Sequence, residues 1–324
     1  MQAIRLKTEH LFDPMGVNFT APRLYWNCNG GKKQTAYQIV AADDGGSILW
    51  DSGRVESAAM CVKWGGAPVP PKTKVFWQVR LWDEENAAGD WSEVSFETGI
   101  GAWSAKWITG DYKVNKKERY PVDCFRKVFT LSDVKKARLY ITACGLYEAR
   151  LNGQRVGDFV RAPGITDYRK RLQYQTYDVT PLLQNGENTL TVQLADGWYR
   201  GSCGAWGLKN QYGTETKLLA QLELTHADGS VQTIVTDESW DWSNDGPIRF
   251  ADNKDGEVVN AQKAPSYSSK AKVTSYPVTP SASNNVPVTE HERMKPVCIT
   301  TPSGKTVLDF GQNLAGYAEF TVTA

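Results

Sequence analysis

Carboxylates are the side chains of this sequence that could most directly carry out chemistry. They gather at residues 83–85, at residues 237–238 and in the stretch that holds Asp252, Asp255 and Glu257. Two carboxylates placed across one bond are sufficient to hydrolyse a glycoside, one as the acid and the other as the base or nucleophile. All three groups lie in turn-like sequence, which favours solvated turn residues over catalytic ones. From these groups we predict no catalytic residue.

The third acidic group also has some similarity to a calcium-binding loop. Its sequence, ADNKDGE at 251–257, places Asp252, Asp255 and Glu257 close together, but Lys254 stands where an EF-hand has an oxygen ligand. A solvated turn and a calcium site formed by these three side chains remain open as alternatives. Calcium is the only cofactor that the sequence suggests.

Other catalytic signatures are missing from the sequence. The three histidines, His10, His226 and His291, lie in different segments, which argues against a histidine-based metal site or a catalytic triad. There is no GxSxG motif, and SGKT at 303–306 lacks the upstream glycine of a phosphate-binding loop. The six cysteines contain no CxxC pair, so zinc-ligand spacing is absent.

One segment combines glycines with large aromatic residues. LADGWYRGSCGAWGLKNQYGT at 194–214 holds five glycines, two tryptophans and two tyrosines. Glycine weakens a strand and adds nothing to its packing, so this composition predicts a long loop. Its rings either fold back onto the domain or form a binding surface.

Charge and hydropathy exclude several classes of partner. The 324 residues carry 37 basic and 36 acidic side chains in an even mixture, which argues against nucleic acid and membrane surfaces as partners. The first residues lack the apolar stretch of a signal peptide, and no later run is long enough to span a bilayer. We therefore expect a cytoplasmic protein.

Alternation of apolar and polar residues predicts an all-β chain of tandem sandwiches. Segments such as YQIVAADDGGSILWDSG and ARLYITACGLYEARLNGQRVGD alternate with period two and turn at short Gly, Asp or Asn sequences. The length predicts two or three domains. We place a fibronectin-III-like sandwich at 1–102, a larger jelly-roll or galactose-binding-like sandwich at 103–275, and a linker with the beginning of a further sandwich at 276–324.

Three longer motifs resemble a known family. ARLNGQRVGD, APGITDYRKRLQYQTYDVTPLLQNGENTLTVQLADGWYRG and DGPIRFADNKDGEVVNA resemble the N-terminal β domain of bacterial α-L-rhamnosidases of glycoside hydrolase family 78. The preceding segment resembles the fibronectin-type-III-like module that opens many of these enzymes. VLDFGQNLAGYAEFTV resembles the start of the family's next sandwich.

The resemblance implies an inverting glycosidase that releases terminal L-rhamnose from glycosides. The family's acid and base lie in a C-terminal (α/α)6 barrel, to which no residue here corresponds, so no catalytic residue is carried over and we expect this chain alone to be inactive. In some relatives the β domain acts as a rhamnose-binding module with bound calcium. A sugar site is therefore predicted in the 194–214 loop, with the residues Asp196, Trp198, Tyr199, Arg200 and Trp206.

Three functions remain open from the sequence. The chain is the non-catalytic N-terminal part of an α-L-rhamnosidase, a free-standing carbohydrate-binding protein without hydrolase activity, or a hydrolase whose carboxylates lie on its β domains. The strand at the end of the sequence favours the first of these functions. For that function we expect rhamnose-containing glycosides and a C-terminal catalytic domain as partners.

Overall fold

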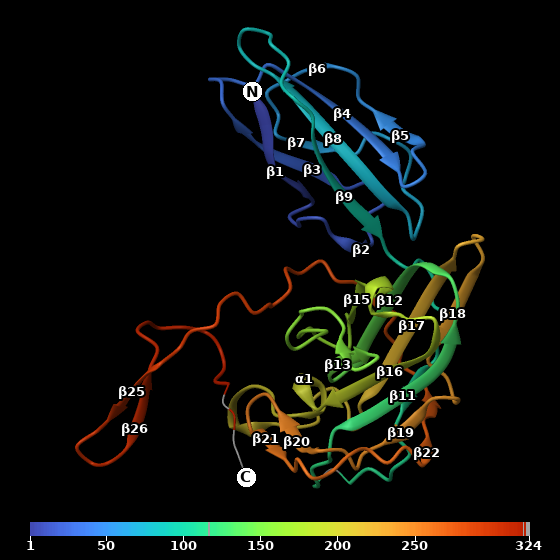
Figure 1. Ribbon diagram of the computed structural model, residues 1–324, viewed down its shortest axis with the longest axis vertical. Coiled ribbons are helices and arrows are strands. Elements are labelled where there is room, and N and C mark those ends of the chain that lie inside the picture. Colours follow the sequence, from blue (N-terminus) through green and yellow to red (C-terminus); the bar gives the residue numbers. More distant parts are fainter. Residues whose placement is uncertain (116, 320, 322–324) are drawn as a thin grey trace. The chain divides into compact units, whose positions relative to one another are not determined.

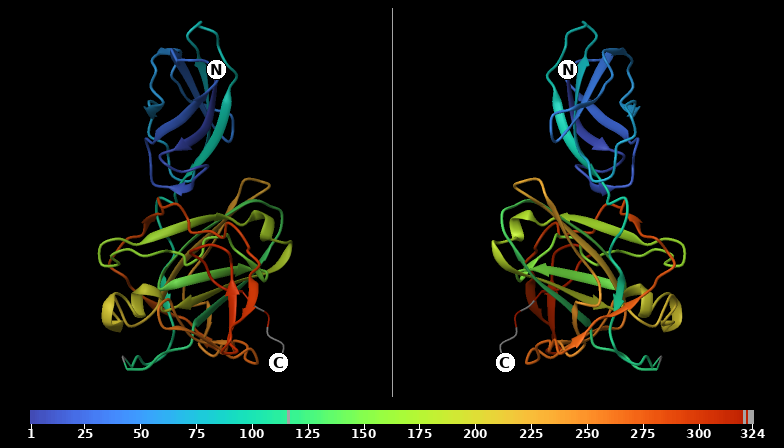
Figure 2. Two further views of the ribbon diagram at one scale, coloured as in Figure 1. Left: turned by 90° about the vertical axis from the view of Figure 1, so that its left-hand side faces the viewer. Right: turned by 90° about the vertical axis from the view of Figure 1, so that its right-hand side faces the viewer.

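A computed structural model of the protein describes residues 1–115, 117–319 and 321. Strands make up nearly all of its regular structure, which confirms the all-β prediction of tandem β-sandwich domains. Two compact units are found, Met1–Pro287 and Val288–Ala324. Figure 2 shows the N-terminal strands, in blue to cyan, gathered in one sandwich and the green to orange strands in a second.

The N-terminal sandwich packs two sheets against each other. One has the strand order β1-β3-β7, and the other has the order β2-β9-β8-β4-β5, with β6 on the edge of β4. All neighbours are antiparallel except β2, which runs parallel to β9. The strands are β1 (Gln2–Thr8), β2 (Met15–Val17), β3 (Arg23–Asn29), β4 (Ala36–Asp43), β5 (Ile48–Asp51), β6 (Val55–Glu56), β7 (Cys61–Lys63), β8 (Lys74–Trp82) and β9 (Ser92–Thr98).

The period-two pattern explains how these strands pack. Tyr37, Ile39 and Ala41 of β4 are buried on one face, as the sequence predicts. In β8 the buried Trp77 donates from its indole Nε1 to Thr8 Oγ1 at 3.0 Å, so the polar atom of this core tryptophan is satisfied.

The second sandwich also has two sheets around one core (Figure 1). The strand orders are β23-β10-β17-β12-β15-β24, with β18 beside β17, and β14-β13-β16-β11-β19-β22. The first sheet contains β10 (Trp107–Thr109), β12 (Val134–Cys144), β15 (Gln173–Asp178), β17 (Lys217–His226), β18 (Val231–Val235), β23 (Lys272–Thr274) and β24 (Ser281–Ala282). The second contains β11 (Asp123–Leu131), β13 (Leu146–Leu151), β14 (Gln154–Arg155), β16 (Gly186–Ala195), β19 (Asp241–Ser243) and β22 (Ser269–Lys270).

Turn chemistry sets the register of the second sandwich. Asn152 and Gly153 both have positive φ, at 52° and 79°, and connect β13 to β14 as the predicted hairpin. After β15 the chain forms a short 3-10 helix, η1 (Thr180–Leu182). A separate hairpin, β20 (Ile248–Asp252) and β21 (Gly256–Val259), lies near α1 (Gly197–Arg200) in Figure 1.

Strand β12 departs from the one-sided pattern that its sequence predicts. Leu139 and Ile141 face the core, but Tyr140 on the opposite face is also buried, in a cluster with Ile100 and Tyr174. The reason is that this face packs at the end of the N-terminal sandwich, where Tyr174 Oη accepts from Ile100 N at 3.1 Å.

An ion pair is buried at the same junction. Arg138 Nε and Nη2 donate to the Glu97 carboxylate at 2.9 Å each, and both side chains are less than a tenth exposed. Arg138 Nη1 also lies 2.9 Å from Asp178 Oδ2. Burial lowers the pKa of Arg138, but its hydrogen bonds to Glu97 outweigh this and raise it.

The Ser- and Pro-rich stretch after residue 264 adds the short edge strands β22, β23 and β24 to both sheets. The unit Val288–Ala324 contains one hairpin, β25 (Val297–Thr300) with β26 (Thr306–Asp309), within its described residues. In the described part of the chain, no helix is long and apolar enough to cross a membrane. The boundaries at 102/103 and 275/276 stay predictions.

Candidate functional site

The segment after β16 folds into two short helical turns instead of an open loop. Asp196 precedes α1, and Gly197 turns the chain away from the strand with a φ of 53°. Gly201 follows α1 where a Cβ would lie 2.2 Å from Asp252 Oδ2 and 2.4 Å from Gly197 O, so no larger residue fits without movement. A second turn, η2 (Ala205–Gly207), follows.

Arg200 is held inside this end of the sandwich by two carboxylates. Its side chain is 4% exposed, and Nε donates to Asp196 Oδ1 at 2.7 Å. Nη2 lies 3.9 Å from Asp123 Oδ2 in a second ion pair, and Nη1 donates to Tyr112 Oη. The guanidinium also stands 5.4 Å from the centre of the Tyr120 ring.

Asp123 anchors the network from the first residue of β11. Its side chain is fully buried, and Trp242 Nε1 donates to Oδ1 at 3.0 Å. Tyr112 Oη at 3.3 Å and Thr216 Oγ1 both donate to Oδ2. A buried carboxylate is stable only with such partners, so these contacts fix the position of Arg200 as well.

Burial dominates the ionisation of the network. It raises the pKa of Asp123 and of Asp196, and the positive charge of Arg200 opposes both shifts. Burial lowers the pKa of Arg200, but the two carboxylates outweigh this and raise it further above its ordinary value. Arg200 therefore stays protonated at every pH at which the protein is folded.

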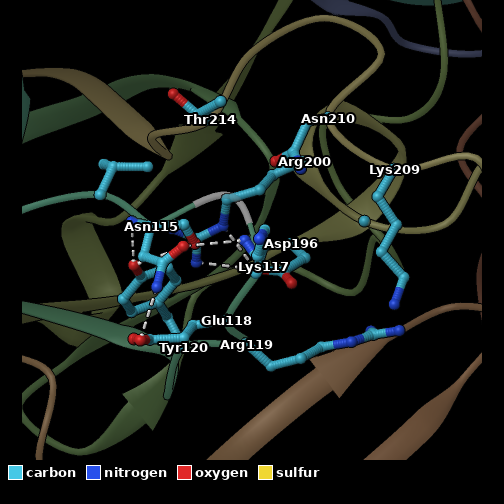
Figure 3. Close-up of a pocket in the computed structure, with 12 residues that line it drawn as sticks. Asn115, Lys117, Glu118, Arg119, Tyr120, Asp196, Arg200, Lys209, Asn210 and Thr214 are labelled. Carbon is cyan, nitrogen blue, oxygen red and sulfur yellow. Dashed lines mark hydrogen bonds and ion pairs between the residues drawn. The ribbon is translucent and has the colours of Figure 1, made fainter.

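A cavity of about 130 Å³ opens beside this network. Figure 3 shows Arg200 and Asp196 in its wall, with the side chains of Asn115, of residues 117–120 and of the segment after η2 around them. Polar and charged groups make up most of the lining, and the ring of Tyr120 supplies an aromatic surface. The residues that line it are Val114, Asn115, Lys117, Glu118, Arg119, Tyr120, Asp196, Arg200, Gly201, Lys209, Asn210 and Thr214.

The structure separates the five residues predicted as a sugar site. Asp196 and Arg200 lie together at the cavity. Tyr199 is buried and packs edge-on against Tyr168, and Trp198 is half-buried against the same cluster. Trp206 is 93% exposed and does not line the cavity. Packing therefore explains Tyr199 and most of Trp198, and leaves Trp206 as a free surface ring.

The three carboxylates predicted as a calcium site do not come together. Asp252 Oδ1 accepts from the backbone amides of Lys254 and Asp255 at 2.8 and 3.0 Å, and Oδ2 accepts from Ser202 N at 2.6 Å. Glu257 is exposed on β21. Among the described residues, no group of three or more His, Cys, Asp or Glu side chains could hold a metal ion.

Positively charged side chains lie beside Asp252 and Asp255. Arg119 Nη2 pairs with Asp255 Oδ2, and Lys209 Nζ lies 3.8 Å from the same oxygen. The hydrogen bond from Ser202 and then the pairing with Arg119 lower the pKa of Asp255. Carboxylates that accept from backbone amides and face two positive side chains do not fit a calcium ion.

Sequence reasoning missed Asp123, Tyr112, Arg119 and Tyr120. A signal for Asp123 was available, since it stands between Val122 and Cys124-Phe125 at the start of an apolar strand. A carboxylate in such a place has to be paired when the strand is buried. Tyr112, Arg119 and Tyr120 carry no comparable signal, because only the tertiary fold brings them to α1.

The fold and this site define a modular all-β protein with a polar cavity at one end of its second sandwich. Residues 132–301 match the family of the α-L-rhamnosidase N-terminal domain, and residues 3–102 match the Rha78A-like N-terminal immunoglobulin domain. The chain belongs to the α-L-rhamnosidase family and corresponds to its N-terminal region. A β-sandwich is shown for the first domain, and the fibronectin type III subtype stays a prediction.

Individual relatives agree with this assignment. An α-L-rhamnosidase of Formosa agariphila is 38% identical over 78% of this chain and 30% of its own length. The structure of a native α-L-rhamnosidase from Aspergillus terreus aligns with a TM-score of 0.89 and 34% identity, over 96% of this chain and 39% of that one. The structure of the Streptomyces avermitilis α-L-rhamnosidase complexed with L-rhamnose aligns with a TM-score of 0.86 and 26% identity, over 97% of this chain and 49% of that one. The chain spans 30% to 50% of the length of the curated relatives it matches.

Proposed function

We propose that the whole protein is an α-L-rhamnosidase that releases terminal L-rhamnose from glycosides, and that this chain is its non-catalytic β part. The observation that carries the proposal is the match of two successive N-terminal domains of that family, over residues 3–102 and 132–301. The relatives extend two to three times as far as the region they share with this chain, which leaves room in them for a separate catalytic domain.

The local roles of the acidic groups support a non-catalytic part. Asp83 Oδ1 accepts from the amides of Glu85 and Ala87 at 3.0 and 2.9 Å, and Asp237 Oδ1 accepts from Ser239 N at 2.9 Å. These carboxylates hold turns. Glycoside hydrolysis needs a carboxyl group with a raised pKa facing a second one across the scissile bond.

The hairpin of the unit Val288–Ala324 supports a further contact with a C-terminal catalytic region. Val297, Val307 and Leu308 of β25 and β26 are about half exposed or more. An isolated two-stranded hairpin is at best marginally stable in water, so apolar side chains on it favour burial against another part of the protein.

Carbohydrate binding is the finer part of the proposal. Asp196 and Arg200 offer charged hydrogen-bonding groups at the cavity, and Trp206 presents an exposed ring of the kind that stacks on a sugar. Rhamnose-containing glycosides are the proposed ligands, because the relatives are α-L-rhamnosidases.

The test is turnover of a chromogenic α-L-rhamnoside by the purified chain between pH 5 and pH 8. The expected result is no release of the chromophore. Turnover that disappears when one carboxylate within these 324 residues is replaced would overturn the non-catalytic assignment. Release that survives every such replacement identifies a contaminating enzyme, and a chain freed of it is then expected to be inactive.

A further inference from the structure

A second cavity, of about 240 Å³, lies where the two sandwiches meet. At this junction β2 of the N-terminal sandwich contacts β15 of the second one (Figure 1). The cavity is bordered by the residues that follow β2, by the residue Arg171 ahead of β15, and by β24 with the residues after it. The residues that line it are Asn18, Phe19, Arg171, Ser281, Ala282, Ser283 and Asn284.

Two serine hydroxyls reach the cavity from β24 and the residue after it. The backbone amides of Ser281 and Ser283 donate to Leu172 O and Tyr174 O, both at 2.9 Å, which holds this segment beside β15. Ala282, between the serines, is buried in the cluster with Tyr174. Because side chains alternate along a strand, the two hydroxyls share the opposite face. Within the described chain, neither hydroxyl makes a hydrogen bond.

Two asparagines offer the donor ends of their amides. Asn18 Oδ1 accepts from Tyr174 Oη at 3.1 Å. Asn284 Oδ1 accepts from Arg171 Nη2 at 2.5 Å and from Gln173 Nε2 at 2.9 Å. Both amide oxygens are therefore occupied. Their Nδ2 groups make no hydrogen bond to any described residue and remain available as donors.

Arg171 brings the positive charge of the lining. Its backbone N–H donates to Asp167 O at 2.9 Å, and its carbonyl accepts from Thr166 Oγ1 at 2.6 Å. Among the described residues, its guanidinium bonds only to Asn284 and forms no ion pair. The neighbouring Arg169 differs, because its Nε lies 3.0 Å from Asp167 Oδ1. Arg171 is therefore a cation whose charge no carboxylate of the described fold neutralises.

The charge and the hydrogen-bonding groups of the lining favour an anionic ligand. The guanidinium and the two amide nitrogens only donate, and each serine hydroxyl can donate as well. No described residue of the lining carries a carboxylate that would repel a negative charge. A carboxylate bonds to a guanidinium more strongly than a neutral acceptor does, and it offers about four lone-pair sites. Donors on five side chains exceed what one carboxylate fills, so hydroxyl oxygens of the same ligand can accept from the rest.

The volume of the cavity fits one ring with its carboxylate. A space of about 150 Å³ holds one benzene-sized ring in a protein. The 240 Å³ at the junction therefore leaves room for a carboxylate and for ring hydroxyls. Phe19, which packs against the core of the N-terminal sandwich, supplies an apolar wall for the ring.

We propose that the cavity at the junction of the two sandwiches binds a single hydroxylated ring that carries one carboxylate. The carboxylate accepts from the guanidinium of Arg171 and from Asn284 Nδ2, and the ring hydroxyls bond to Ser281 and Ser283. Because Asn18 and Phe19 belong to the N-terminal sandwich, the bound ligand contacts both sandwiches. The site is separate from the cavity beside α1 and requires no rhamnosidase activity.

The experiment is a calorimetric titration of the whole chain with D-glucuronate, and with methyl β-D-glucopyranoside as the neutral probe of the same ring size. The neutral probe is expected to bind at least about tenfold more weakly than D-glucuronate, as for the loss of a hydrogen bond between charged groups. Arg171→Met is expected to weaken the binding of D-glucuronate by about tenfold or more for the same reason. The double variant Ser281→Ala, Ser283→Ala is expected to weaken it by about fivefold or more, as for two neutral hydrogen bonds.

Arg169→Met is the matched control, because Arg169 is an exposed arginine two residues from Arg171 that does not line the cavity. It is expected to bind D-glucuronate like the wild type. Four outcomes each overturn the proposal: no wild-type binding at about 10 mM D-glucuronate, equal binding of the neutral probe, wild-type affinity in Arg171→Met, and loss of binding in Arg169→Met. Melting curves identify a variant that fails to fold, and the exposed position of Arg171 keeps the test decisive if the double serine variant does.

Discussion

Replacement of Arg200 by methionine is expected to destabilise the second sandwich strongly, and most strongly at neutral pH. The change removes the only cation within ion-pairing distance of both Asp123 and Asp196 among the described residues. Side-chain exposures of 0% for Asp123 and 8% for Asp196 mean that water cannot replace it. Removing one partner of a buried ion pair costs about 3–5 kcal/mol of unfolding free energy.

The pH dependence follows from the direction of the shifts. Burial raises the pKa of Asp123 and Asp196 in the folded protein above the value of 3.8 for a free aspartate, and Arg200 opposes the rise. Without Arg200 both values rise further. A carboxyl group whose pKa is higher in the folded protein than in the unfolded chain stabilises the folded state at any pH below its unfolded-state pKa. This stabilisation is lost as the pH rises through its folded-state pKa. The penalty of Arg200→Met is therefore largest at pH 7 and shrinks towards pH 4.

The assay is urea unfolding followed by circular dichroism at pH 7 and at pH 4.5, with the wild type measured under each condition. We expect the difference in unfolding free energy between wild type and variant to fall by about half or more at the lower pH. Arg249→Met is the matched control, because Arg249 pairs with Asp245 at the same i,i+4 spacing but in an exposed position. It is expected to cost about 0.5 kcal/mol or less. A loss below about 1 kcal/mol for Arg200→Met at pH 7, or an equal loss at both pH values, would refute the reasoning.

Three further changes test other parts of the structure. Arg138→Ala removes the hydrogen-bonded partner of the buried Glu97 carboxylate and leaves it only the ion pair with Lys136 at 3.7 Å, so it is expected to cost about 3 kcal/mol in urea unfolding; a change within about 1 kcal/mol would contradict a buried pair. Gly201→Ala places a methyl group against Asp252 Oδ2 and the backbone, so a lowered melting temperature is expected. An unchanged or higher melting temperature would show that the turn can hold a Cβ atom at this position. Tyr199→Ala truncates a core side chain and is expected to cost about 3–5 kcal/mol of unfolding free energy. A wild-type melting curve for this variant would contradict the burial of the Tyr199 ring.

The strands were more predictable from the sequence than the site. Period-two alternation in the stretch around Ile39 and the Asn152-Gly153 turn are local signals, and the structure has the strands and hairpin that they indicate. The burial of Tyr140 could not be predicted, because a second domain covers that face. Burial of this kind depends on contacts between residues far apart in the chain.

The candidate site likewise combines residues that a local sequence pattern indicates with residues that only the tertiary fold brings together. Asp196 and Arg200 were predicted as site residues because they flank aromatics in an unusual segment, and the structure pairs them four residues apart on one turn. Their partner Asp123 comes from β11, more than 70 residues earlier in the chain, and no local pattern pairs the two elements. Trp206 and Tyr199 have similar surroundings in the sequence but opposite exposure, since only the fold decides which ring finds a core to pack against.

The central proposal is that this chain is the non-catalytic β part of an α-L-rhamnosidase. The measurement that tests it most directly is turnover of a chromogenic α-L-rhamnoside, compared between the purified chain and the whole protein. The predicted result is release of the chromophore by the whole protein and none by the chain. Turnover by the chain that disappears when one of its own carboxylates is replaced would contradict the proposal.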